Sequence, residues 1–351
     1  MSKDNRFTIG FDVSDTTGTI AVIAHDGNIV TERSLLLTPE AVHATFSTFP
    51  PSLVALEAGG QSRWLTFLLH RLGHHVLVAN PRTIPLLTRN SRKSDRMDAL
   101  LLARIARIQP ELLHPITLRS HEAQRDYMEL LARDLLVRQR TAAIAFVRAQ
   151  AKQFGVRLAD CDADQFHRKA LDWLPQDLLD GLEPLLHHIH DLTEQIKRFD
   201  RRQQALLRRY PAAAALQQQI HGVGSITALA FVLTIDDPRR FTHSRTVGAY
   251  AGLAPRRAQS GTADPQLHIS KAGNSFLRKL LVQCAQYILG PFGKDSDLRR
   301  WGLRKAGDGN RQQKRRAVVG MARKLAVLMH ALWTSGEVYE PLRNATVTAS
   351  A

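Results

Sequence analysis

Four acidic residues, Asp12, Glu57, Asp95 and Asp98, occur in contexts that could support chemistry on phosphate groups. Asp12 lies in the apolar run FTIGFDV, and Glu57 ends the apolar run SLVALEA, so each is expected near the end of a strand. Asp95 and Asp98 are three residues apart in SDRMDALLLARIA, which places both carboxylates on one helical face. Two divalent metals held ~3.5–4 Å apart by such carboxylates would stabilise both oxygens of an in-line phosphoryl displacement.

Each acid also has an alternative interpretation. An unpaired carboxylate buried among the apolar neighbours of Asp12 would cost several kcal/mol, which favours a functional role there. Glu57 could be an ordinary acid at a strand end, and Asp95 and Asp98 could be helix N-terminal charges favoured by the macrodipole. Cations that would suit phosphate binding interleave with the last two acids: Arg92, Lys93 and Arg96.

The order of elements around these acids predicts an α/β domain over residues 6–115. FTIGFDV, TIAVIAH and GNIVTERSLLL are expected to form three antiparallel strands. A helix from Pro39, capped by Thr38, then precedes the strand SLVALEA, a helix over residues 62–72 and the strand HHVLVAN. Three antiparallel strands followed by alternating helix and strand is the order of a ribonuclease-H-type fold.

The composition favours a polyanionic partner. The chain has 351 residues, with 48 Lys and Arg against 32 Asp and Glu, a formal charge of +16 and a pI near 10.5. Nucleic acid is the commonest partner of so basic a protein. No apolar run approaches the ~20 residues of a spanning helix, and the N-terminus lacks a signal-peptide core, so no membrane role and a cytoplasmic location are expected. Two cysteines are too few for a disulfide framework or a cysteine zinc site.

Residues 120–216 predict a helical connector with a coiled-coil seam. Apolar residues recur there at spacings of four and three, interrupted once by Gln203. The members are Leu185, Ile189, Leu192, Ile196, Phe199, Gln203 and Leu206. The seam could pack against an earlier helix, from Ala123 to about Phe154, or against a second subunit, and the sequence leaves both open.

Residues 217–335 predict a mostly helical second nucleic-acid module, followed by a disordered tail at 336–351. IHGVGSITALAFV resembles a helix-hairpin-helix element, in which Gly222 and Gly224 would let backbone amides approach a phosphate. An exposed basic loop around Ser260 follows, and residues 294–324 carry eleven basic and three acidic residues. The cations expected to contact nucleic acid are Arg256, Arg257, Lys271, Arg278, Lys279, Lys314, Arg315 and Arg316.

With these elements in one chain, the sequence resembles transposases of insertion-sequence family one-ten, whose relatives include the Piv-type DNA invertases. The resemblance spans about Ile9 to Leu332. Its most specific motifs are IGFDVS, ALEAGG, KSDRMDA, IHGVGSITA, GLAPRRAQSG and ISKAGNSFLRKLL. It implies a RuvC-like N-terminal domain with a DEDD tetrad of Asp12, Glu57, Asp95 and Asp98 that binds Mg²⁺ or Mn²⁺.

The resemblance also implies a catalytic serine in the Ser-Gly pair after Gly-Leu-Ala-Pro, which is Ser260, with Ser270 as the second choice. Where the family commonly has a Gly-rich stretch, this chain has Thr-Ala-Asp-Pro from position 262, so the shape of the loop is left open. The resemblance further implies donor and target DNA, a bridge RNA that selects both, and one composite site in which the two domains meet. The coiled-coil seam and the need to bring two DNAs together predict a homodimer or homotetramer. Association with the nucleoid during activity follows from the DNA substrates.

Two other functions remain as alternatives. A RuvC-like nuclease or junction resolvase would use metal-activated water and would leave Ser260 without a role. A non-catalytic DNA- or RNA-binding protein would use the four acids structurally. A covalent protein–DNA adduct separates the recombinase from the nuclease, because hydrolysis does not form one. Loss of binding on substitution of any of the four acids would favour the binding protein, and retained binding with lost strand exchange would reject it.

Overall fold

The computed structural model describes residues 7–81, 94–261, 264, 265 and 267–344. The chain divides into two compact units, Met1–Leu118 and Arg119–Ala351. Each unit is built around its own buried apolar clusters and is described separately below.

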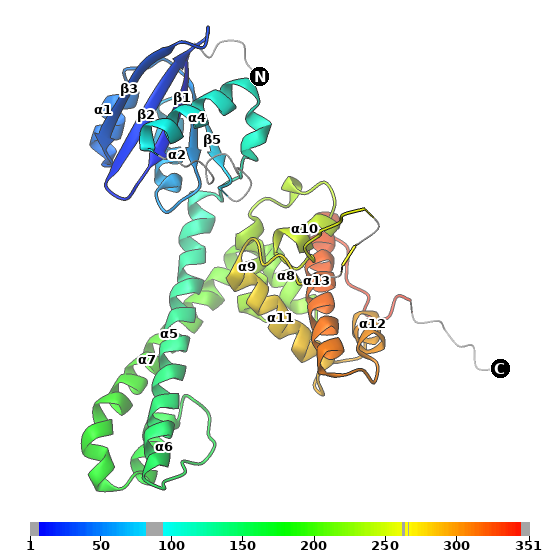
Figure 1. Cartoon of the computed structure of the whole chain (residues 1–351). Helices are drawn as coiled ribbons and strands as arrows, with labels where there is room; N and C mark the ends of the chain where they lie inside the picture. The colour runs from blue at the N-terminus through cyan, green and yellow to red at the C-terminus, as the bar shows by residue number, and fades with distance from the viewer. Residues whose placement is uncertain (1–6, 82–93, 262–263, 266, 345–351) are drawn as a thin grey trace, which may run out of the picture. The chain divides into compact units, whose positions relative to one another are not determined.

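Five strands form one mixed sheet in the N-terminal unit (Figure 1). They are β1 (Phe7–Val13), β2 (Thr17–Ala24), β3 (Ile29–Leu36), β4 (Leu53–Glu57) and β5 (His75–Ala79). The order across the sheet is β3-β2-β1-β4-β5. β1 pairs antiparallel with β2 and parallel with β4; β2–β3 is antiparallel and β4–β5 parallel. This order confirms the α/β class predicted for the unit and is the ribonuclease-H-type arrangement.

Helices cover both faces of this sheet. On one face, α1 (Pro39–Phe46) and α2 (Ser62–Arg71) pack with Phe11 and Leu56 in a buried cluster. On the other, α4 (Asp95–Ile108) packs with the small side chains Ala21 and Ala55. The predicted cap of α1 is confirmed, because Thr38 Oγ1 accepts a hydrogen bond from the Ala41 N–H at 3.2 Å. A short 3₁₀ turn, η1 (Pro110–Leu113), follows α4.

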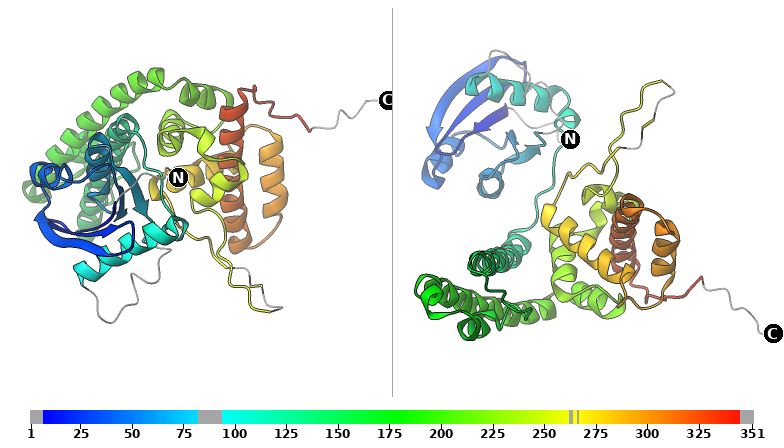
Figure 2. Two further views of the ribbon diagram at one scale, coloured as in Figure 1. Left: turned by 90° about the horizontal axis from the view of Figure 1, so that it is seen from above. Right: turned by 60° about the horizontal axis from the view of Figure 1, so that its bottom comes forward.

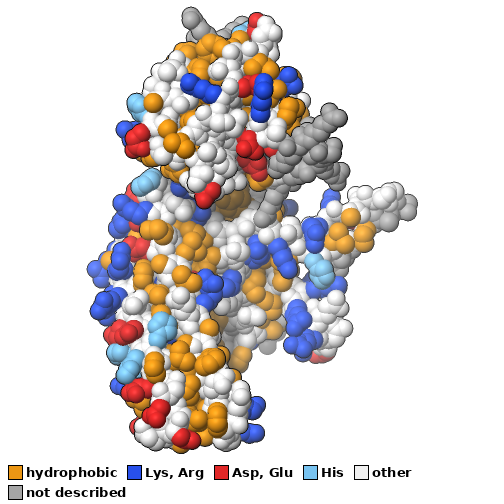
Figure 3. Space-filling model, turned by 60° about the vertical axis from the view of Figure 1, so that its left-hand side comes forward, with side chains coloured by type: hydrophobic (Ala, Val, Ile, Leu, Met, Phe, Trp, Pro, Cys, Tyr) orange, Lys and Arg blue, Asp and Glu red, His pale blue; other side chains and the backbone are white. Residues whose placement is uncertain are grey.

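The second unit begins with an antiparallel helical hairpin. Its helices are α5 (His121–Gln153), the short α6 (Phe166–Trp173) and α7 (Gln176–Arg209). Ion pairs across α5 and α7 show the opposite directions, since Glu122 meets Arg209 near one end and Arg133 meets Asp200 further along. Figure 3 shows hydrophobic side chains interspersed with Lys and Arg along the lower, helical part of the view.

The predicted seam of α7 is largely buried within this hairpin. Ile189, Leu192, Ile196, Gln203 and Leu206 are buried, whereas the two other members are partly exposed. Packing between α7 and α5 therefore occurs within one chain. That finding describes one of the two arrangements left open by the sequence, and the coiled-coil assignment itself stays a prediction.

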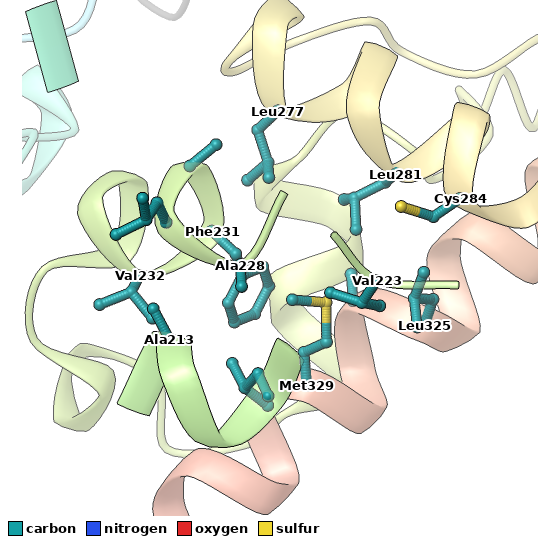
Figure 4. Close-up of a cluster of buried hydrophobic side chains, with 14 of the residues drawn as sticks. Ala213, Val223, Ala228, Phe231, Val232, Leu277, Leu281, Cys284, Leu325 and Met329 are labelled. Carbon is teal, nitrogen blue, oxygen red and sulfur yellow. The ribbon is translucent and has the colours of Figure 1, made fainter. Parts of the chain in front are cut away.

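The remaining helices form one globular cluster around a continuous core. They are α8 (Pro211–Gln219), α9 (Ser225–Ile235), α10 (Arg245–Tyr250), α11 (Ser275–Leu289), α12 (Asp297–Ala306) and α13 (Arg311–Ser335), with the 3₁₀ turn η2 (Pro238–Arg240). Figure 4 shows Phe231 of α9 among side chains from α8, α11 and α13. Helix α9 is buried along its length from Thr227 to Ile235, so it is the centre of this core.

The segment after α13 is held to this cluster. The Tyr339 N–H donates to Gln219 Oε1 at 2.8 Å, and the Asn344 N–H donates to Asp297 Oδ2 at 2.7 Å. The predicted disordered tail, 336–351, therefore has an ordered beginning through Asn344, and its last seven residues lie outside the described residues. Among the described residues, no helix is both long and apolar enough to cross a membrane.

Candidate active site and nucleic-acid interface

Two of the predicted catalytic acids lie side by side at one edge of the sheet. β1 and β4 are parallel, and Phe11 stands opposite Leu56 in their register. The next residues, Asp12 and Glu57, therefore reach the same edge, and their side chains leave the same face because side chains alternate along a strand. Both residues are partly exposed, so they are accessible to a ligand.

The other two acids are at the start of α4, which crosses the face of the sheet that carries Asp12. Gly10 makes this contact possible: a Cβ there would lie 1.8 Å from the carbonyl oxygen of Ala99. Asp98 directly precedes Ala99 and is buried, while Asp95 lies one helical turn earlier and is exposed. Ser94 Oγ caps the helix by accepting from the Met97 N–H at 3.3 Å. The close approach of α4 to β1 thus brings Asp98 toward the strand that holds Asp12.

The start of α4 also lies beside β3. Arg96, one of the predicted phosphate-binding cations, forms an ion pair with Glu32, and this hydrogen-bonded carboxylate raises the pKa of the guanidinium. A surface groove of about 860 Å³ there is lined by Asp95, Thr19 and residues 29–34. Arg92 and Lys93 lie outside the described residues.

The chemistry of the four acids suits a hard divalent cation, because carboxylate oxygens are the ligands that Mg²⁺ and Mn²⁺ prefer. Among the described residues, no three His, Cys, Asp or Glu side chains form a group that could hold a metal ion. A metal site formed by the four carboxylates therefore stays a prediction.

Ser260 lies on an exposed loop of the second unit, seen in yellow in Figures 1 and 2. The loop is paired at its base, where Pro255 and Ile269 form an antiparallel bridge and the Arg256 N–H donates to the His268 carbonyl at 3.0 Å. Arg256 at this base is exposed, as are Arg257 and Ser260 beyond it. A hydroxyl with two neighbouring guanidinium groups on one accessible loop is a suitable place to receive a phosphate.

The base of the serine loop is held by two crossing backbone segments. Gly252 has φ +72° and a Cβ there would lie 1.9 Å from the Ala272 carbonyl oxygen; Gly273 has φ +74° and a Cβ would lie 1.9 Å from the Tyr250 carbonyl oxygen. Only glycine adopts this backbone without a steric penalty and allows so close an approach. The two glycines therefore determine where the loop leaves the helical cluster.

Arg278 of α11 joins the same two segments. Its Nη1 donates to the carbonyl oxygens of Ala251 at 3.1 Å and Ala272 at 3.0 Å. The sequence predicted a nucleic-acid contact for Arg278, but its guanidinium is engaged with the protein backbone. Its neighbour Lys279 pairs with Asp134 of α5. The structure thus gives both cations internal partners, which sequence reasoning missed because those partners are distant in the chain.

Two further candidates lie in the crossing region. Lys271 is exposed and has φ +54°, an uncommon conformation for a residue with a side chain. Ser270, the second choice for the nucleophile, is partly buried, and its Oγ accepts from the Ala272 N–H at 3.3 Å. Its hydroxyl is thus part of the loop base, whereas Ser260 is accessible.

The predicted hairpin glycines lie between α8 and α9. Gly222 has φ +93°, and a Cβ there would lie 2.7 Å from Ile288 Cγ1, so packing against α11 accounts for this glycine. Gly224 is exposed at the start of α9 and has no heavy atom within 4 Å of an added Cβ among the atoms compared. Two helices joined by a short turn are present, and phosphate binding by this turn stays a prediction.

A groove of about 1170 Å³ lies between the base of the serine loop and helices α12 and α13. Two of the three predicted cations at the start of α13, Arg315 and Arg316, line it, and the third, Lys314, is exposed next to them. The sequence also contained three lining cations that were not singled out: Arg304, Lys305 and Arg323. Their only sequence signal was the density of basic residues between 294 and 324.

Both units match transposase families. A family model described as Transposase IS116/IS110/IS902 family matches residues 214–297, and a model of a DEDD transposase domain matches residues 9–155. The chain is 30% identical over 304 residues to the transposase for insertion sequence element IS1328 of Yersinia enterocolitica, covering 84% of this chain and 87% of that protein.

Two other relatives cover nearly the whole chain. A probable family 20 transposase of Pseudomonas aeruginosa is 28% identical, over 96% of this chain and 99% of its own. A pilin gene-inverting protein of Moraxella bovis is 26% identical, over 92% of this chain and 94% of its own. Both the sheet unit and the helical unit therefore have counterparts in proteins named for moving or inverting DNA.

Proposed function

Because the chain belongs to the IS116/IS110/IS902 family of transposases, we propose that it moves a DNA element by metal-dependent strand cleavage with Ser260 as the nucleophile. Membership makes the protein a transposase, an enzyme of DNA recombination. The observation that carries the serine proposal is the exposure of Ser260 on a loop that also presents Arg256 and Arg257 and is anchored at its base.

In the proposed first step, Ser260 Oγ attacks the scissile phosphorus. The new Oγ–P bond forms as one P–O bond to a deoxyribose breaks, and the departing oxygen takes a proton. Serine is a weak nucleophile that needs a base or a metal to accept its own proton, and no histidine is adjacent to it in sequence. Activation is therefore assigned to the acidic set of the first unit, which places the two units in one composite site.

The second step reverses this exchange on a different strand. A free hydroxyl of that strand attacks the phosphoserine, a new phosphodiester forms, and Ser260 Oγ leaves and recovers its proton. Each step exchanges one P–O bond for another, so no external energy source is needed. Arg256, Arg257 and Lys271 would offset negative charge on the transferring phosphoryl group, since all three are exposed around the loop.

Asp12, Glu57, Asp95 and Asp98 would hold the divalent metal, Mg²⁺ or Mn²⁺. When bound, the metal would supply Lewis-acid polarisation of a phosphoryl oxygen and would lower the pKa of a coordinated oxygen nucleophile. The DEDD domain match favours dependence on such a metal. The pairing of Asp12 and Glu57 at one strand edge supports their assignment as the first two ligands.

Selection of the two DNA sites is assigned to a bridge RNA that pairs with donor and target, while the protein contacts the backbone. This division of labour, in which base pairing reads sequence and the protein reads shape, suits a surface rich in arginine. A homodimer or homotetramer is proposed because two DNA sites must be joined for exchange.

The test is the formation of a covalent adduct. Full-length protein, RNA transcribed from the flank of its element, labelled donor and target DNA, and Mg²⁺ are combined and quenched in denaturant. Wild-type protein should give a protease-sensitive protein–DNA adduct that Ser260→Ala and Asp12→Asn both lack. Ser275→Ala, which changes an exposed serine at the start of α11, is the matched control and should keep the adduct.

Other outcomes separate the alternatives. An adduct that persists in Ser260→Ala and disappears in Ser270→Ala would move the nucleophile to Ser270. Cleavage without an adduct, lost in Asp12→Asn and kept in Ser260→Ala, would establish the RuvC-like nuclease. Binding without any strand cleavage would support a non-catalytic nucleic-acid-binding protein.

A further inference from the structure

The groove beside the serine loop has two chemically different walls. One wall is the loop base, with Leu253, Pro255, Leu267 and Ile269. The other is formed by the last turn of α12 and the first three turns of α13, and it carries most of the charge. The groove is thus amphipathic, with an apolar side that belongs to the same loop as Ser260.

The charge of the groove is of one sign. Of its fifteen described lining residues, five are Arg or Lys, one is His268 and none is acidic. The five cations are Arg304, Lys305, Arg315, Arg316 and Arg323.

Within the part of the chain that the structure describes, these five cations also have no carboxylate partner. None of them forms an ion pair with another described residue, whereas Lys279 and Arg300 of the same unit each pair with a carboxylate. An unneutralised cluster of this kind attracts a polyanion and releases its counter-ions on binding. The cationic wall is therefore available for phosphates.

The apolar wall indicates which form of nucleic acid occupies the groove. A double helix presents phosphates and sugars outward and keeps the faces of its bases stacked inside. A single strand exposes base faces, which bind to apolar and aromatic surfaces while cations follow the backbone. A few nucleotides of one strand match this pair of walls, because their base faces can lie on the apolar wall while their phosphates face the cations of the groove, which has a volume of about 1170 Å³.

We propose that this groove binds a short single-stranded segment of nucleic acid. Its phosphates contact the cations of α12 and α13, and its bases lie against Leu267 and Ile269. The inference rests on the proposed function in one respect, because it identifies the bound segment with the strand that continues to Ser260. It adds that the substrate must be unpaired next to the cleavage point.

The experiment measures binding without catalysis. Full-length protein in EDTA is titrated into three fluorescently labelled oligonucleotides of one sequence: single-stranded DNA, single-stranded RNA and duplex DNA. Fluorescence anisotropy gives Kd at several salt concentrations. Tighter binding of single-stranded DNA than of the duplex is expected. Clear preference for single-stranded RNA over single-stranded DNA would reject the identification of the bound segment with the strand that continues to Ser260.

Two variants locate the site. Arg315→Gln/Arg316→Gln should weaken single-strand binding at least tenfold and reduce the slope of log K against log salt by about 1.4, at about 0.7 per lost phosphate contact. Leu267→Ser should reduce the preference for the single strand over the duplex while leaving the salt slope unchanged. Arg168→Gln/Lys169→Gln, which removes two adjacent exposed cations from α6, is the matched control and should change neither quantity.

The inference is overturned if Arg315→Gln/Arg316→Gln binds single strands like wild type, or if the α6 control weakens binding equally. Preferential duplex binding by the wild-type protein would overturn it as well. Circular dichroism of each variant confirms that a lost interaction is not a lost fold. The EDTA titrations do not depend on Ser260 as a nucleophile. Absence of an adduct together with groove-dependent single-strand binding would therefore reject the proposed chemistry alone, and an adduct without that binding would reject the groove alone.

Discussion

The two units position their chemistry in different ways. In the sheet unit, Asp12 and Glu57 are neighbours because two parallel strands are in register, and regular backbone hydrogen bonds hold them there. In the helical unit, Ser260 lies on a loop whose base is paired between residues 254–256 and 268–270. Strand ends can be placed by local pattern alone, whereas the position of a long loop depends on the contacts that hold its base.

This contrast predicts that substitutions in the sheet unit act by disrupting packing, whereas substitutions at the loop base act by displacing the loop. Disruption of the β1–α4 contact should unfold the first unit and remove the acids together. Disruption of the loop base should leave both units folded and should displace Ser260. The four variants below test this difference.

Gly10→Ala should have the largest effect. The added Cβ would lie 1.8 Å from the Ala99 carbonyl oxygen and 2.6 Å from the Ala103 nitrogen, which are backbone atoms that cannot turn aside. We expect a loss of ~2–3 kcal/mol or more in the free energy of unfolding of the sheet unit, measured by urea denaturation. Gly60→Ala is the control, since no heavy atom lies within 4 Å of its added Cβ among the atoms compared. Equal stability of the two variants would show that α4 does not depend on this contact.

Gly252→Ala should have the next largest effect, and on activity more than on stability. It forces a Cβ into a left-handed backbone and against the Ala272 carbonyl oxygen. A penalty of ~1–2 kcal/mol for the conformation alone should shift the loop and reduce adduct yield more than tenfold. Gly155→Ala, at another left-handed position where no heavy atom lies within 4 Å of the added Cβ among the atoms compared, is the control and should keep the adduct. A fully active Gly252→Ala protein would mean that the crossing does not position Ser260.

Arg278→Lys should have a smaller effect that separates positioning from folding. Lysine keeps the charge but cannot bridge the carbonyls of Ala251 and Ala272 with the planar geometry of arginine. We expect about a tenfold slower rate of adduct formation, unchanged DNA affinity and a Tm close to wild type. Arg300→Lys, in which an exposed pair with Asp295 is altered, is the control and should retain the wild-type rate. A loss of affinity with an unchanged rate would instead return Arg278 to the role of a direct nucleic-acid contact.

His74 should give the smallest effect, a pH dependence confined to the sheet unit. The side chain is buried: its Nδ1 accepts from the Ser52 N–H at 3.3 Å and its Nε2 lies 3.2 Å from the Phe46 carbonyl oxygen. Burial lowers the pKa of His74 below the ordinary value near 6.5, so the unfolded state binds the proton more readily. The stability contribution is complete above about pH 6.5 and is lost progressively as the pH falls toward the lower, folded pKa.

The measurement for His74 is Tm as a function of pH between 7.5 and 5. His74→Gln should lower the Tm at pH 7.5 but flatten its fall on acidification. His25→Gln, at an exposed position, should follow the wild-type curve. A steep acid dependence that survives His74→Gln would assign it to other groups.

The sequence by itself determined the elements of the sheet unit and the position of its first two acids. Alternating apolar runs predicted the five strands in their order along the chain, and Thr38 predicted the start of α1. The same local signals located the helix that carries both Asp95 and Asp98 and the long helices of the hairpin. These features were predictable because periodicity, capping and turn preference act over a few residues.

Only the tertiary structure decided how the second unit uses its basic residues. Arg278, Lys279 and Arg315 look alike in the sequence, yet the first holds two backbone carbonyls, the second pairs with Asp134 and the third lines an open groove. Likewise, the sequence shows Gly10 only as a glycine within a strand. Its close contact with α4, about ninety residues later in the chain, exists only in the folded protein. Whether a charge is neutralised by the protein or left for a ligand depends on groups that are distant in sequence and meet only in the folded chain, because electrostatic and packing energies depend on distance in space.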